Sequence, residues 1–250
     1  MTVHVDGLTI DWLGYATVRI EGPETIVYVD PGRYGVLTGE WTADSETAAE
    51  AHPPATDYRP EDGDALFVTH RHHYDPDGIE RVASDDATCV TFDGINFHQT
   101  ARTDVRPADL PYEVRSVGLE SQGIVGDVTF WTISAYNHPD GPHTRPDGSP
   151  VHPEGLGCGY LLSVDGTRVF VAGDTDVLEG HAQLDVDVFV PPIGGTYTMD
   201  RHAAADLADA MAPELVVPVH YNTFEAIETD SEAFAADLDE RGVAVELDEE

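Results

Sequence analysis

The 250-residue chain is long enough to bury a sizeable core, and its 41% of hydrophobic residues excludes a disordered chain. No apolar run approaches the roughly 20 residues that a membrane helix needs, and Met1–Asp11 has neither a basic stretch nor an apolar run, so we expect a soluble cytoplasmic protein without a secretory signal. The 48 acidic and 12 basic residues give a net charge of −36, and every basic residue is arginine; this composition favours a protein adapted to molar salt.

Short apolar or alternating segments, separated by Gly, Pro and Asp, predict strands along most of the chain. Asp165-Gly166 stands between two of them and indicates a tight hairpin turn. Residues 38–63 are polar and rich in Ala, Pro and Asp, so we expect a surface excursion there. The expected strands are Leu8–Leu13, Ala16–Glu21, Ile26–Val29, Ala65–Thr69, Cys89–Phe92, Glu113–Val117, Ile124–Val125, Val128–Ser134, Tyr160–Val164, Arg168–Ala172, Val186–Val190, Leu215–Val219 and Val243–Leu247.

Three segments predict helices: Gly78–Ser84, a segment that begins after an N-cap at Asp200 and runs through Met211, and a segment from a capping Ser231 to Gly242. Strands dominate the first half of the chain, and strands mixed with helices the second, with no linker between them. We therefore expect residues 1–250 to form one α/β (α+β) domain, in which two sheets pack face to face with helices outside.

A cluster of histidines directly follows the buried strand Ala65–Thr69. Side chains at i and i+2 of an extended segment point the same way, so His70 and His72 can converge on one ion, while His73 and Asp75 fall on a different side. Imidazole together with carboxylate is a ligand set for Zn²⁺, Mn²⁺ or Fe²⁺. A single His-X-His run is weak evidence, because a polar loop can carry the same residues.

Three further strand ends strengthen the prediction of a metal site. His138 follows the strand Val128–Ser134, Asp174 follows Arg168–Ala172, and His220 follows Leu215–Val219. Strand ends of packed sheets present functional groups on rigid supports. Four strand ends that each offer a ligand are far more specific than any one of them.

The order of these motifs resembles the metallo-β-lactamase superfamily, and more narrowly the branch that contains ascorbate-6-phosphate lactonases and many uncharacterised metal-dependent hydrolases. Trp12-Leu13-Gly14-Tyr15-Ala16-Thr17 resembles the opening Leu-Gly-His-Ala segment of that branch, with Tyr for His. Asp30-Pro31 and the Pro-Ile-Gly segment at 192–199 match as well. The resemblance implies an αββα sandwich of two mainly antiparallel sheets.

The resemblance also implies roles for individual residues. His70, His72 and His138 match the histidines of a first metal site, Asp174 matches the carboxylate that bridges two metals, and His220 matches the histidine of a second site. One or two divalent ions, Zn²⁺ or Mn²⁺, are the implied cofactors.

The chain departs from the family at Tyr74-Asp75, where the family has Asp-His. Asp75 can still supply an oxygen ligand, and His73 is the alternative; an oxygen-richer second site would favour Mn²⁺. Asp174, Asp75 and His73 are the candidate catalytic residues.

Further residues are candidates for the surroundings of the metals. His143 and Arg145, in the Pro- and Gly-rich loop 139–157, could contact an anionic substrate together with His152, and Tyr197 and Tyr221 could line the pocket. Each of these residues could instead have a surface or core role. Asp30 is expected to hold a ligand histidine. Four other histidines, His4, His52, His98 and His181, are expected at the surface.

These features favour a hydrolase that opens a lactone, ester or phosphoester of a small molecule with hydroxide held by metal. Phosphodiester cleavage of nucleic acid is less favoured, because the extra domains or arms of superfamily nucleases are not evident. The sequence also leaves open iron-dependent redox chemistry on the same fold and a degenerate metal-binding protein without turnover. We expect no membrane partner, and a homo-oligomer is left open.

Overall fold

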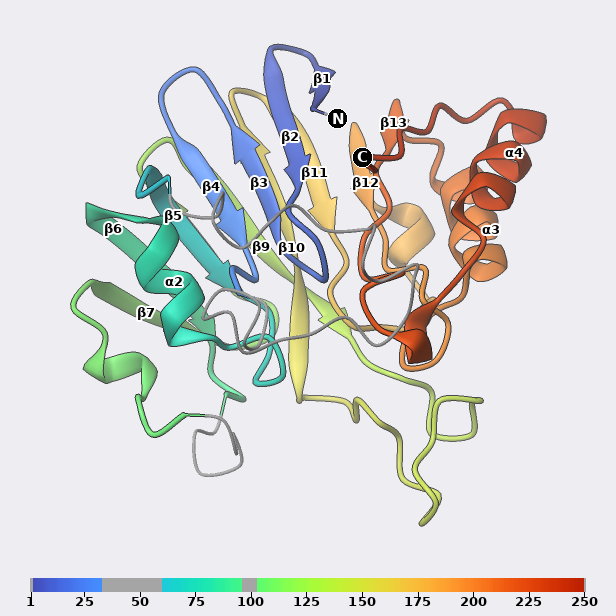
Figure 1. Cartoon of the computed structure of the whole chain (residues 1–250), viewed down its shortest axis with the longest axis horizontal. Helices are drawn as coiled ribbons and strands as arrows, with labels where there is room; N and C mark the ends of the chain where they lie inside the picture. Colours follow the sequence, from blue (N-terminus) through green and yellow to red (C-terminus); the bar gives the residue numbers. More distant parts are fainter. Residues whose placement is uncertain (1, 33–59, 96–102, 250) are drawn as a thin grey trace.

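The computed structural model describes residues 2–32, 60–95 and 103–249, and their strands form two sheets (Figure 1). The expected excursion at 38–63 falls almost entirely outside these residues, as do His52 and His98. The first sheet has the order β1-β2-β3-β4-β5-β6-β7, and the second β13-β12-β11-β10-β9-β8. The strands are β1 Val3–Val5, β2 Leu8–Trp12, β3 Val18–Glu21, β4 Ile26–Val29, β5 Gly63–Val68, β6 Ala83–Phe92, β7 Glu113–Val117, β8 Gln122–Val125, β9 Val128–Ala135, β10 Gly157–Val164, β11 Thr167–Val171, β12 Val188–Val190 and β13 Leu215–Val216.

Both sheets are mixed, whereas the resemblance implied mainly antiparallel ones. Strands β1 to β4 pair antiparallel, and β4 to β7 pair parallel. Strands β8 to β11 pair antiparallel, and β11 to β13 pair parallel. Parallel neighbours need a crossover connection, which α2 (Pro76–Val82) provides between β5 and β6 and α3 (Arg201–Met211) between β12 and β13.

The helices lie outside the sheets and complete an αββα arrangement. In Figure 1, α2 packs beside β5 and β6, and α3 lies with α4 (Ser231–Arg241) on the far side of β12 and β13. Asp200 caps α3 as expected, since its carboxylate accepts from His202 N and Ala203 N. For α4 the capping side chain is Asp230 rather than Ser231. The 3₁₀ turns are η3 Pro107–Asp109, η4 His181–Gln183 and η5 Glu225–Ile227.

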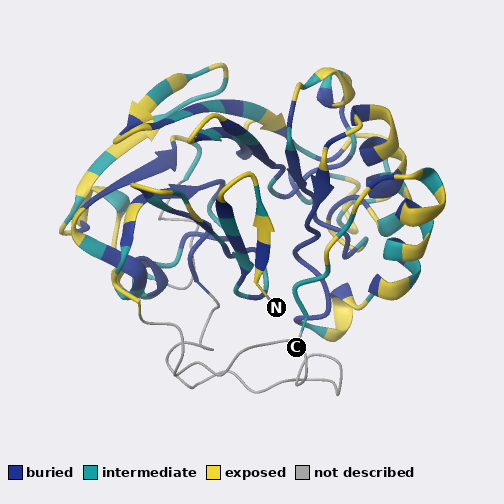
Figure 2. Cartoon of the chain, turned by 90° about the horizontal axis from the view of Figure 1, so that it is seen from above, coloured by how far each residue is buried: buried dark blue, intermediate teal, exposed yellow. Residues whose placement is uncertain are grey.

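Strand β5 is buried on both faces, as its apolar sequence predicts. Ala65 and Phe67 belong to the core between the sheets, and Leu66 and Val68 belong to a second cluster beneath α2. Each fully buried large side chain contributes about 1.5–3 kcal/mol of transfer free energy. Figure 2, seen from above, shows buried residues where the two layers of strands face each other. The chain that leaves β5 therefore starts from a rigid support.

Strands β5 and β11 end toward the same edge of the sandwich, at the bottom of Figure 1, where the loop between β9 and β10 also extends. The hairpin from β10 to β11 turns at Asp165 (φ 49°) and Gly166 (φ 88°), the two positive φ values that a type I′ turn requires. The expected last strand, Val243–Leu247, makes only a bridge between Val216 and Val245.

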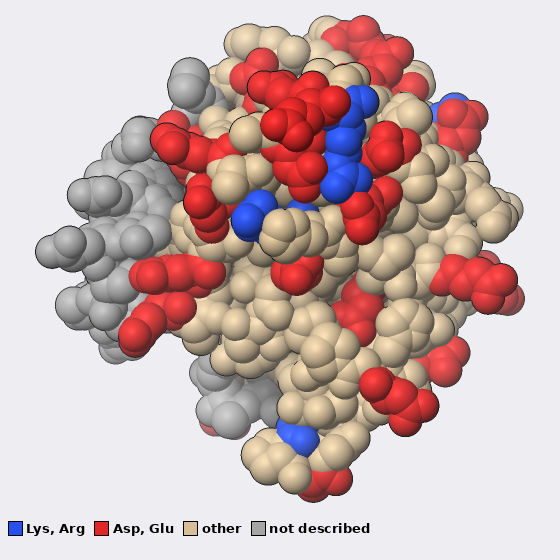
Figure 3. Space-filling model, turned by 90° about the vertical axis from the view of Figure 1, so that its right-hand side faces the viewer, with Lys and Arg blue, Asp and Glu red and all other residues tan. Residues whose placement is uncertain are grey.

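The face that carries α3 and α4 displays many more acidic than basic side chains (Figure 3). Among the described residues, no helix has the length and apolarity to cross a membrane.

Candidate metal centre

The histidine segment after β5 is a turn rather than an extended strand. His73 N donates to His70 O at 3.2 Å, which closes a turn over residues 70–73. The rings of His70 and His72 lie 5.0 Å apart, and those of His70 and His73 lie 4.3 Å apart. Because the backbone turns here, His73 joins the cluster instead of pointing away from it.

Asp174, three residues beyond the end of β11, lies at the centre of the cluster. Its Oδ2 lies 3.6 Å from His70 Nε2 and 3.2 Å from His152 Nε2. Its Oδ1 lies 3.5 Å from His73 Nε2 and 3.4 Å from His220 Nε2. The carboxylate thus presents one oxygen to each of two groups of imidazole nitrogens.

On the Oδ2 side, His72 Nδ1 completes the group, 3.1 Å from His152 Nε2. His70, His72 and His152 place ligand atoms within 4.8 Å of one another, and so do His70, His73 and Asp174. A tetrahedral Zn²⁺ with bonds of about 2.0–2.1 Å separates its ligand atoms by about 3.3 Å. The observed separations of 3.1–3.6 Å fit such an ion on either side of Asp174.

Unpaired buried atoms point to the same conclusion. Within the described parts of the chain, four buried ligand atoms around Asp174 have no hydrogen-bond partner: His70 Nε2, His73 Nε2, His220 Nε2 and Asp174 Oδ1. Leaving one such group unpaired costs about 1–3 kcal/mol, so several at one point indicate a common partner. A metal ion bound in this cluster would supply such a partner.

Hydrogen bonds to the opposite ring nitrogens set the orientation of the histidines. Asp30 Oδ2 lies 2.7 Å from His73 Nδ1, and Thr69 Oγ1 lies 2.9 Å from His70 Nδ1 while donating to Asp30 Oδ2 at 2.7 Å. These contacts place the proton on Nδ1 and leave Nε2 free for an ion. Asp30 thus contacts His73 directly and His70 through Thr69.

Burial keeps most of the imidazoles neutral, which is the form that binds metal. It holds the pKa of His70 well below its usual range and lowers the pKa of His72 to about 3. For His73, burial lowers the pKa, but Asp174 and Asp30 outweigh it and raise the pKa above the ordinary value. Burial disfavours the Asp174 anion too, yet the surrounding histidines, His220 first, bring its pKa below the usual range.

The structure does not bring His138 into the cluster, and His152 takes its place. His138 is exposed, and its Nε2 lies 2.9 Å from Val177 O. His152 is 3% exposed and lies in the loop that follows His138. The position of His138 just after β9 made it the expected ligand; the only sequence signal for His152 was its membership of the loop expected beside the metals.

Asp75 is also absent from the cluster. Its carboxylate Oδ1 accepts from Asp77 N and Gly78 N and caps α2, a role typical of Asp before a Pro at the first helical position. Tyr74 is 1% exposed and belongs to the cluster beneath α2. His73 and His220 therefore face Asp174 Oδ1 without help from Asp75.

The residues expected to bind substrate have other partners. His143 has both ring nitrogens engaged, Nδ1 by Asp176 Oδ1 at 2.5 Å and Nε2 by Gly195 O at 2.9 Å. Arg145 donates to Pro150 O and Val151 O, and these two hydrogen bonds connect the two ends of its own loop segment.

The two tyrosines expected at the pocket differ from each other in exposure. Tyr221 is buried and stacks on Trp12 with ring centroids 4.5 Å apart, so it lines no open pocket. Tyr197 is 39% exposed, and its carbonyl oxygen accepts from His152 Nδ1 at 3.2 Å.

His181, expected at the surface, is buried and donates from Nε2 to Ser134 O at 3.0 Å.

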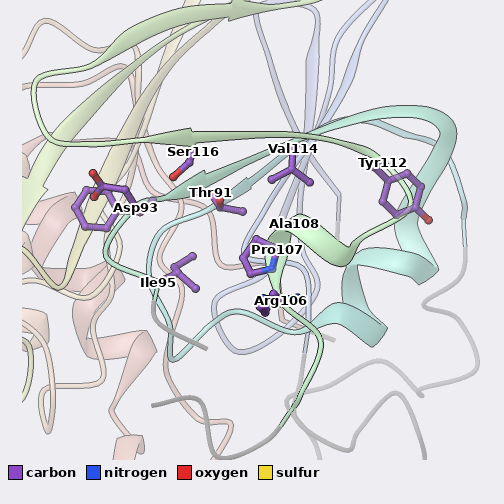
Figure 4. A pocket seen from close by; sticks show the side chains of 10 residues that line it. Thr91, Asp93, Ile95, Arg106, Pro107, Ala108, Tyr112, Val114 and Ser116 are labelled. Atoms are coloured by element: carbon purple, nitrogen blue, oxygen red, sulfur yellow. The ribbon is translucent and has the colours of Figure 1, made fainter. Parts of the chain in front are cut away.

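A cavity of about 510 Å³ lies away from the histidines, on the outer face of β6 and β7 (Figure 4). Thr91, Val114 and Ser116 from the strands and Pro107 from η3 line it. None of its lining residues belongs to the histidine and aspartate cluster, so it is no part of the candidate centre.

Comparisons with known proteins agree with this geometry. A sequence profile described as the beta-lactamase superfamily domain matches residues 9–220. A UPF0173 metal-dependent hydrolase of Thermococcus kodakarensis is 30% identical over 235 residues, covering 90% of this chain and 89% of the relative. A UPF0173 metal-dependent hydrolase of Archaeoglobus fulgidus is 28% identical over 250 residues, covering 96% and 94%.

Among solved structures, Igni18, a metallo hydrolase from Ignicoccus hospitalis, is similar with a TM-score of 0.63 and 21% identity, covering 96% of this chain and 94% of the other. Such a likeness shows the shared fold and nothing of the substrate. The profile match, the two relatives and the cluster around Asp174 agree: the chain belongs to the metallo-β-lactamase superfamily and, within it, to the UPF0173 family of metal-dependent hydrolases.

Proposed function

We propose that this protein hydrolyses a lactone, ester or phosphoester of a small molecule with two divalent metal ions. His70, His72 and His152 would hold the first ion, His73 and His220 the second, and Asp174 would bridge them. The observation that carries the proposal is the position of the Asp174 carboxylate. Each of its two oxygens faces a separate pair of imidazole nitrogens, at 3.2–3.6 Å.

Divalent ions at such a centre acidify water and polarise a carbonyl or phosphoryl oxygen, which is the chemistry that ester hydrolysis needs. The residues of the chain fix the geometry for it. Asp30 holds the ring of His73, and the carbonyl of Tyr197 holds the ring of His152. All these histidines except the half-buried His72 are buried, which restricts the access of bulk water to the centre.

Positive charge beside the centre favours an anionic substrate. Arg71 Nε lies 3.4 Å from His72 Nε2, on the side of that ring opposite to the cluster. Its pKa is lowered first by burial and then by the nearby Arg145. Two neighbouring guanidinium groups in a chain of net charge −36 would attract a phosphate or carboxylate group of the substrate.

Metal analysis of protein purified in high salt, followed by turnover assays on lactones, carboxylic esters and phosphodiesters, tests the proposal. We expect two equivalents of Zn²⁺ or Mn²⁺ and turnover that Asp174→Asn abolishes. Asp140→Asn, in the exposed loop, is the matched control and should keep full activity. Iron with oxygen uptake would favour redox chemistry instead, and tightly bound metal without turnover would favour a metal-binding protein.

A further inference from the structure

The loop that carries His152 has little regular structure of its own. Residues 136–156 join β9 to β10, and beyond a single bridge between Thr144 and Pro150 they belong to no helix or strand. A metal ligand must be held to within about 0.5 Å to act. His70 obtains this rigidity from β5, so contacts with other parts of the chain must supply it to His152.

Asn137 forms two hydrogen bonds with the backbone of His152. Asn137 N donates to His152 O at 2.7 Å, and His152 N donates to Asn137 Oδ1 at 2.8 Å. The amide group of Asn137 is itself fixed, because Nδ2 donates to Asp176 Oδ1 and to Tyr197 O, both at 3.0 Å. The position of His152 therefore depends on the position of Asp176.

Asp176 is in turn held by His143, from the same loop as His152. His143 Nδ1 donates to Asp176 Oδ1 at 2.5 Å, and Nε2 donates to Gly195 O at 2.9 Å. Both partners are hydrogen-bond acceptors, and each faces a ring nitrogen of His143. The side chains of His143 and Asp176 are only 11% and 9% exposed, where a hydrogen bond to a carboxylate is strong.

We propose that His143 is a positioning residue for the metal ligand His152, acting through Asp176 and Asn137. His143 joins three loops: its own, the Asp174–Asp176 loop and the loop at Gly195. The backbone carbonyl of His143 also accepts a hydrogen bond, at 3.0 Å, from the N–H of Val151, the residue before His152. Without the imidazole, Asp176 Oδ1 loses one of its hydrogen-bond donors, and the carboxylate that fixes the amide of Asn137 is held less firmly. The inference rests on the metal centre of the proposed function.

Metal affinity of the whole protein, measured by chelator competition with Zn²⁺, tests the proposal, together with the visible spectrum of the Co²⁺-substituted protein. We expect His143→Ala to weaken Zn²⁺ binding at the first site, which contains His152, about 10-fold, the lower end of what contacts behind a ligand typically contribute, and to change the Co²⁺ spectrum. His143→Gln can still donate to Asp176 and should recover part of the loss. His138→Ala removes an exposed histidine from the same loop. Its Zn²⁺ affinity should stay within about twofold of wild type, since only the backbone N–H of His138 bonds to Asp176.

A double-mutant cycle with Asp176→Asn separates positioning from general destabilisation. If His143 acts through Asp176, His143→Ala costs little more affinity in the Asp176→Asn background, although each single change weakens binding. Unchanged Zn²⁺ affinity and Co²⁺ spectrum in His143→Ala would overturn the proposal, as would fully additive losses or a wild-type protein that binds no metal. Wild-type metal binding without hydrolysis would sink the proposed function and leave this inference standing.

Discussion

Replacing His152 by alanine is the sharpest test of the metal centre, because the neighbouring His138 offers a matched control. Both are histidines in or beside the loop between β9 and β10, and their removal changes composition identically. His152 Nε2 lies 3.2 Å from Asp174 Oδ2 and 3.1 Å from His72 Nδ1. His138 contacts neither of these side chains in the described structure, and its ring lies against Val177 O.

The magnitude follows from the number of ligands. Apparent Zn²⁺ binding energies of about 10–16 kcal/mol, shared over four ligand atoms, give about 2.5–4 kcal/mol for each. His152→Ala should therefore weaken the first metal by about 10²- to 10³-fold. The fold should lose far less stability, since Asn137 bonds to the backbone of residue 152, which the substitution keeps. In the metal-free protein the substitution removes the hydrogen bond to Tyr197 O, worth about 1 kcal/mol, and the contacts of the ring with His72 and Asp174.

The assay is chelator competition on dialysed protein, with circular dichroism to verify the fold. His138→Ala should bind Zn²⁺ within about twofold of wild type, because an exposed hydrogen bond contributes little. A loss of affinity in His138→Ala equal to or larger than that in His152→Ala would refute the assignment of the third histidine.

Two further expectations concern the second metal and the surface charge. Asp174 and Asp30 outweigh burial and raise the pKa of His73 above the ordinary value, so His73 holds a proton more firmly than an ordinary imidazole. Binding of the second ion should therefore release protons and tighten as pH rises, and calorimetry in buffers of different ionisation enthalpy counts them. His73→Asn should abolish that proton release and lower the metal stoichiometry toward one. Asp75→Ala should keep two metals and lose about 1 kcal/mol of stability, because it removes the cap of α2. A stoichiometry of one metal in Asp75→Ala would contradict the placement of Asp75 outside the metal centre. The net charge of −36 predicts that the fold weakens at low salt, where self-repulsion is unscreened; circular dichroism over a salt series measures this, and equal stability in dilute buffer would exclude it.

Strand ends made part of this centre predictable from sequence. His70, Asp174 and His220 each follow a short apolar strand. The local sequence pattern is enough to predict buried strands such as β5. His152 could not be found in this way. The loop that carries it is shaped by Asn137, Asp176 and Tyr197, whose contacts join residues 15–60 positions apart in the chain. No periodicity encodes such contacts.

The departure at Tyr74-Asp75 has a chemical consequence that differs from the one the sequence suggested. An extended segment 70–75 would put His73 and Asp75 together on the far side and imply an oxygen-rich second site. The turn that His73 N closes onto His70 O separates them: Asp75 caps α2, and His73 faces Asp174. An imidazole thus stands where a carboxylate was expected. Two nitrogens and one oxygen, from His73, His220 and Asp174, make a softer set than one nitrogen and two oxygens, so the second site should favour Zn²⁺ over Mn²⁺.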